Sequence, residues 1–204
     1  ISGTLDVILL SWFFGEAIVG IYAAARKLLA LGGVIVISFT TAVFPYLSHL
    51  YKTSVESFKS VVQGLVKYLL AFILPVVLVI FWLADKLVIL LYTDAYVDSI
   101  PVLQILIWVL ALKFLNLPLS YILFARGDQK QSFQVAAITL PVYLVIALVL
   151  TPKWSAIGMA TALTLSSLVS FAVYFFFAFR NEGAFRLLLQ LGAVMIAGGI
   201  SSAI

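Results

Sequence analysis

The sequence contains no cysteine and a single histidine, His49. The absence of cysteine excludes disulfide bonds, thiolate metal sites and cysteine nucleophiles. One imidazole alone argues against a histidine metal site and against a serine–histidine relay. A glycine-rich phosphate loop is also missing, so no ATPase module lies within this sequence. We therefore expect no metal, no cofactor and no enzymatic activity.

Charge is scarce as well. Charged residues form 10% of the 204 residues, whereas they form about 25% of a soluble domain. Hydrophobic residues form 65%, against about 45–50% in a soluble domain. A soluble fold of this size has too much surface for so few charges. The net charge of +4 is small and does not point to nucleic acid as a partner. The composition predicts a protein whose outer surface faces the lipid bilayer.

Long apolar runs without polar alternation, such as residues 69–83 and 135–150, recur along the chain. A helix crosses a bilayer core in about 20 residues, whereas barrel strands alternate apolar and polar positions. The pattern predicts an all-α, polytopic transmembrane bundle with helical segments at 1–14, 17–50, 57–83, 100–124, 132–150, 156–179 and from 187 onwards. Ile1 lies inside an apolar run. We read no signal peptide and expect a fragment that begins within a helix of a longer protein.

The basic residues of the connecting loops predict the orientation. The loops that follow segments 17–50, 100–124 and 156–179 hold six of them: Lys52, Lys59, Arg126, Lys130, Arg180 and Arg186. The alternate loops hold two, Lys86 and Lys153. Because basic loops stay in the cytoplasm, we expect the first three loops there and the first helix running from inside to outside.

Four further basic residues fall within the predicted spans, where an ionisable group costs about 2.5–3.5 kcal/mol by insertion scales. Lys113 is the deepest, and Asn116, one turn later, is expected to share its face. Arg26 and Lys27 are adjacent, so they point about 100° apart and we expect one of them to face the interior. Each lysine or arginine either faces a cavity or extends along lipid to the interface. For Lys67 we favour the interface.

Asp6 is the one acidic residue within a predicted span. A carboxylate there can pair with a basic residue or carry a coupling ion. The alternative places Asp6 near the inner interface, where water solvates it.

Small residues recur at every fourth position of segment 156–179, at Gly158, Ala162, Ser166 and Ser170. This spacing allows two helix backbones to approach closely. We predict that this face packs against another helix.

The order of several short motifs resembles a known family. They are VGIYAAARKL at 19–28, FPYLS at 44–48, LLYTDAY at 90–96, LQIL at 103–106, ARGD at 125–128 and IGMATA at 157–162. The order is similar to that in the second half of oligosaccharide flippases, also called polysaccharide biosynthesis export proteins. These belong to the superfamily that includes multidrug and toxic compound extrusion transporters. The resemblance implies that residues 1–181 form the second six-helix lobe around a central cavity, with 182–204 beginning a further helix.

The resemblance also implies a function, translocation of a lipid-linked oligosaccharide across the cytoplasmic membrane for surface polysaccharide or glycan assembly. The expected partners are a polyprenyl-diphosphate-linked oligosaccharide, the bilayer and the N-terminal lobe of the same protein. The family has no strict site motif, so the assignment of Lys113, Arg26, Lys27 and Asn116 to substrate rests on the residues themselves.

Two alternatives remain open at this point. A drug or cation antiporter of the same superfamily would favour acidic residues in the membrane, whereas basic residues outnumber acidic ones four to one within these spans. The other alternative is a membrane scaffold that does not transport.

Overall fold

A computed structural model describes residues 2–179, and every element in this part of the chain is helical. The elements are α1 (Ser2–Phe13), α2 (Glu16–Thr53), α3 (Val55–Trp82), α4 (Ala84–Tyr92), the 3-10 helix η1 (Asp94–Tyr96), α5 (Ser99–Arg126) and α6 (Gln129–Phe179). The predicted all-α class is confirmed. The additional helix expected within 182–204 lies outside the described residues.

Four of these helices, α2, α3, α5 and α6, are long and apolar enough to cross a membrane. The nine-residue α4 is too short to cross. Local signals set several boundaries. Ser54 caps α3, because its hydroxyl accepts a hydrogen bond from the Ser57 N–H at 3.2 Å. Gly127 ends α5 in the left-handed conformation, φ 81°, which favours glycine.

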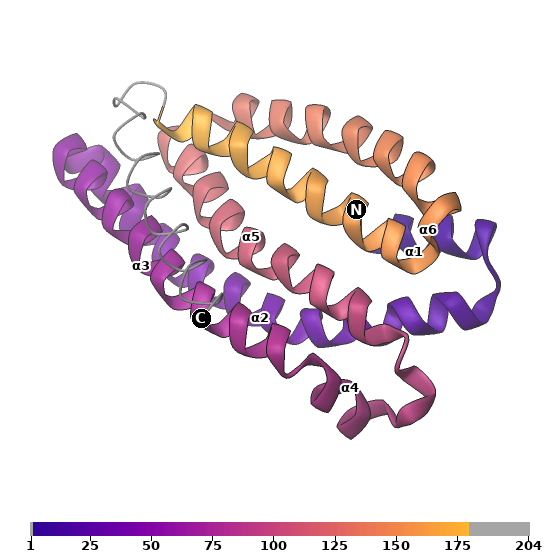
Figure 1. Cartoon of the computed structure of the whole chain (residues 1–204). Helices are drawn as coiled ribbons and strands as arrows, with labels where there is room; N and C mark the ends of the chain where they lie inside the picture. Colours follow the sequence, from indigo (N-terminus) through magenta and orange to yellow (C-terminus); the bar gives the residue numbers. More distant parts are fainter. Residues whose placement is uncertain (1, 180–204) are drawn as a thin grey trace, which may run out of the picture.

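Helix α6 is bent back on itself at Ser155, where φ is 54° and ψ is −130°. Residues 129–154 form a first arm and residues 156–179 a second arm, and the two run antiparallel (Figure 1). The sequence predicted two segments separated near Pro152, and the structure confirms the reversal while moving it to Ser155. The positive φ of a non-glycine residue strains the backbone at this bend.

Helix α5 crosses the middle of the bundle, between α2 and α3 on one side and the two arms of α6 on the other (Figure 1). Leu106, Leu119 and Ile122 of this helix are fully buried. Large apolar side chains on outer helices are instead exposed, such as Trp12 at 79% and Phe133 at 73%. Exposed aromatic side chains of this kind suit a surface that lipid covers.

The helix ends divide into two groups. The α2–α3 junction, the α5–α6 turn and the end of α6 lie together, and the α1–α2 turn, α4 and the bend of α6 lie at the opposite end (Figure 1). Arg126 ties the first group together, since its guanidinium donates to the Ala178 carbonyl at 2.7 Å and lies 5.4 Å from the centre of the Phe58 ring. The grouping agrees with the expected alternation of the loops. Which of the two groups of helix ends faces the cytoplasm stays a prediction.

The small-residue face of the second arm packs closely near the bend. Gly158 and Ala162 are buried, and a Cβ at Gly158 would lie 2.3 Å from the carbonyl oxygen of Leu150 on the first arm. The predicted close packing is confirmed at this end. Further along, Ser166 and Ser170 border a cavity instead.

We expect Gly158→Ala to destabilise the protein, because a methyl group there requires the two arms of α6 to separate. Overpacking of this kind costs about 1–3 kcal/mol. Gly33→Ala is the matched control, since a Cβ at Gly33 meets nothing within 4 Å and alanine favours helix. Thermal unfolding in detergent should show a lower midpoint for Gly158→Ala only. Equal midpoints would contradict the close packing.

The orientation is testable in the cysteine-free chain by single cysteines at Ser57 and Ala95, both exposed and at opposite ends of the bundle. Ser99 would be a poor position, because it is buried and its hydroxyl donates to the Ile21 carbonyl at 2.9 Å. In intact cells, we expect an impermeant maleimide to label Ala95→Cys and to spare Ser57→Cys. The reverse labelling would show that the orientation is inverted.

Candidate functional site

A buried ion pair joins α1 to α2. The side chain of Asp6 has no exposed surface. Its Oδ1 accepts a hydrogen bond from Arg26 Nη1 at 2.6 Å, and its Oδ2 accepts one from the Tyr22 hydroxyl at 2.8 Å. Tyr22 and Arg26 lie four residues apart on α2, so they share one face of that helix. The Val7 N–H donates to the same Oδ1 at 3.1 Å.

These contacts decide between the two interpretations of Asp6. Burial excludes a solvated carboxylate at the interface. A lone carboxylate at such a position would be strongly destabilising, and Arg26 and Tyr22 compensate its lost hydration. Both carboxylate oxygens accept hydrogen bonds, so a cation bound at Asp6 would have to displace Arg26. The coupling-ion role stays a prediction.

The ion pair leaves excess positive charge nearby. The Arg26 side chain is 26% exposed, so it is not sealed inside the bundle as Asp6 is. Lys113 is exposed on α5, which packs against α2, and it lies within electrostatic range of Arg26 and Asp6. Two cations therefore stand near one carboxylate. Lys27 is exposed on a different face of α2 from Arg26, so the structure places Arg26, rather than both neighbours, in this cluster. We call Asp6, Arg26 and Lys113 the charged cluster.

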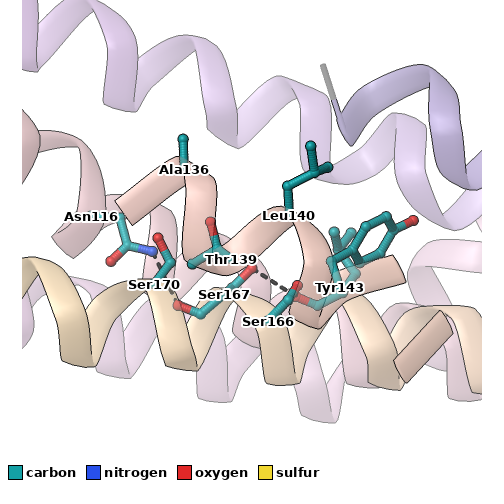
Figure 2. Close-up of a pocket in the computed structure, with 9 residues that line it drawn as sticks. Asn116, Ala136, Thr139, Leu140, Tyr143, Ser166, Ser167 and Ser170 are labelled. Carbon is teal, nitrogen blue, oxygen red and sulfur yellow. Dashed lines mark hydrogen bonds between the residues drawn. The ribbon is translucent and has the colours of Figure 1, made fainter. Parts of the chain in front are cut away.

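A cavity of about 350 Å³ lies between α5 and the two arms of α6 (Figure 2). Its polar lining consists of Asn116, Thr139, Tyr143, Ser166, Ser167 and Ser170. Asn116 turns toward the second arm of α6, where its Nδ2 donates to the Ser167 carbonyl at 3.2 Å. Lys113 does not line this cavity. The two side chains predicted to share a face therefore point to neighbouring regions, about 60° apart around α5.

Tyr143 connects the cavity with the charged cluster. Its ring lines the cavity, is 3% exposed and feels the charges of Asp6 and Arg26. Its hydroxyl donates to the sulfur of Met159 at 3.3 Å. Sequence reasoning missed Thr139, Tyr143 and Ser167. One feature of the sequence could have indicated Thr139 and Tyr143. They are four residues apart, which puts both on one face of an otherwise apolar arm.

The fold defines an α-helical, multi-pass membrane protein with a charged cluster and a polar cavity inside its helix bundle. Over residues 1–198 the chain matches the family described as "Lipid II flippase MurJ", and it belongs to that family. The expected relationship to lipid-linked glycan flippases is thereby confirmed.

A curated relative supports the same relationship. The chain is 26% identical over 171 residues to the "Capsular polysaccharide biosynthesis protein CapF" of Staphylococcus aureus. The match covers 83% of this chain and 43% of that relative. The chain therefore spans less than half the length of the relative.

The effect of replacing Asp6 on the stability of the protein should depend strongly on whether Arg26 is present, because the two side chains form a buried ion pair. Removing one member of a buried pair costs about 3–5 kcal/mol, and we expect less here because Arg26 is partly exposed. Asp6→Asn and Arg26→Gln should each lower the unfolding midpoint, and the double variant should be more stable than the sum of both losses predicts. Tyr22→Phe, which removes one hydrogen bond, should lower the midpoint less. Strict additivity in thermal unfolding would contradict the pairing.

Proposed function

We propose that this chain forms one lobe of a transporter that flips a lipid-linked oligosaccharide across the cytoplasmic membrane for surface polysaccharide or glycan assembly. Membership of the MurJ family and the similarity to CapF support this function. The substrate class would be a polyprenyl diphosphate that carries sugars. We further propose that residues 1–181 are the second lobe and that an N-terminal lobe completes the central cavity.

The charged cluster is the observation that carries the proposal. A diphosphate that enters a membrane protein loses its hydration, and this cost is prohibitive unless cations replace the water. Arg26 offers a planar fork of donors that matches phosphate oxygens, and Lys113 offers a mobile point charge. Asp6 holds Arg26 by one nitrogen, Nη1. This contact fixes the position of the guanidinium without covering all of it.

The same cluster argues against the antiporter alternative. A transporter of cationic drugs needs a carboxylate that is free to meet its substrate. Among the described residues, Asp6 is the one fully buried acidic side chain, and Arg26 and Tyr22 occupy it. The charge balance thus favours an anionic head group over a cationic one.

We expect Lys113→Ala to abolish or strongly reduce translocation in the full-length protein, since the diphosphate would lose a cation in a low-dielectric region. Lys113→Arg should retain part of the activity, because the charge persists while the geometry changes. The measurement is the appearance of a labelled lipid-linked oligosaccharide in the opposite leaflet of proteoliposomes.

Lys67→Ala is the matched control. Lys67 is also an exposed lysine within a membrane helix, but we expect it to extend to the interface. Its removal should leave translocation unchanged. Normal transport by Lys113→Ala, at equal protein levels in the liposomes, would show that Lys113 is likewise an interfacial lysine.

A further inference from the structure

Three hydroxyl groups of the cavity donate their hydrogens to backbone carbonyls. Thr139 donates to the Val135 carbonyl at 2.8 Å, and Ser166 and Ser167 both donate to the Leu163 carbonyl, at 3.0 and 2.7 Å. The hydroxyl of each of these side chains has one donor and two acceptor lone pairs. These three hydroxyl groups therefore offer a ligand their acceptor lone pairs.

Asn116 adds to this acceptor character. Its Nδ2 already donates to Ser167, whereas its Oδ1 is buried and has no hydrogen-bond partner among the described residues. Within residues 2–179, no charged side chain lines the cavity. A phosphate would find few donors there, the Ser170 hydroxyl and the second N–H of Asn116, and no cation among the described residues, so it is disfavoured. A neutral ligand with O–H or N–H groups would donate hydrogen bonds to the acceptors that line the cavity.

The position of the cavity fits one part of a glycosyl diphosphate. Asn116 follows Lys113 by one helical turn on α5, and Tyr143, which lines the cavity, lies within electrostatic range of Arg26. The first sugar of such a lipid is bonded directly to the diphosphate. A diphosphate held by Arg26 and Lys113 would therefore bring that sugar toward the turn of α5 that carries Asn116. A volume of about 350 Å³ falls in the range of small-molecule sites, about 300–1,000 Å³.

We propose that the cavity between α5 and the arms of α6 is a saccharide subsite, in which Asn116, Ser166 and Ser170 accept hydrogen bonds from the hydroxyl or acetamido N–H groups of the sugar next to the diphosphate. This inference rests on the proposed function. It assigns the charged cluster to the diphosphate and the neutral cavity to the glycan.

Two probes separate these assignments in the full-length protein: bare polyprenyl diphosphate, and the same lipid carrying a disaccharide. We expect Asn116→Leu and Ser170→Val to weaken binding of the glycosylated probe by about two- to ten-fold per lost hydrogen bond, with unchanged binding of the bare lipid. Lys113→Ala should weaken both probes alike. Ser120→Ala is the control, since Ser120 lies one turn beyond Asn116 and does not line the cavity.

The outcomes distinguish the inference from the function on which it rests. Equal weakening of both probes by the cavity variants would overturn the saccharide subsite and leave the flippase proposal standing. Failure of the parent protein to bind either probe would overturn both. Thermal unfolding checks that each variant is folded, and the smaller change Ser170→Ala serves if Asn116→Leu is not.

Discussion

The pairing of Asp6 with Arg26 is the interaction on which the charged interior of this bundle depends. Neither group is tolerated alone among apolar helices, because each would lose its hydration without replacement. Together they join α1 to α2, and Tyr22 completes the coordination of the carboxylate. Asp6 also fixes where the Arg26 guanidinium lies. A cation held in this way, with Lys113 nearby, can meet an anionic head group without a large rearrangement.

Helix α5 organises the regions that surround this pair. It lies between α2, α3 and α6 and carries Lys113 and Asn116 on adjacent faces. Lys113 interacts with the charged cluster, and Asn116 lines the polar cavity. A substrate with a charged diphosphate and neutral sugars presents the same two chemistries side by side. Under the proposed function, one helix thus brings together the regions that recognise both.

The sequence predicted the helices well, because bilayer thickness, Gly127 and Pro152 are local constraints. It also singled out Arg26 and Lys113 from the cost of charge in lipid. Which neighbour Asn116 meets was not predicted, since it depends on a rotation of about 60° around α5 relative to Lys113. Thr139, Tyr143 and Ser167 come together only because α6 folds back at Ser155. The contacts of Asp6 likewise depend on how α1 packs against α2, which no local pattern specifies.

The central claim is that the charged cluster recognises a diphosphate. Its most direct test is the affinity of the purified full-length protein for one polyprenyl chain bearing a hydroxyl, a monophosphate or a diphosphate, measured by native mass spectrometry. The account predicts that affinity rises along this series, and that the rise shrinks at high salt, because screening weakens partly exposed charges. Equal affinity for all three lipids would show that the protein binds the chain alone, and would contradict the claim.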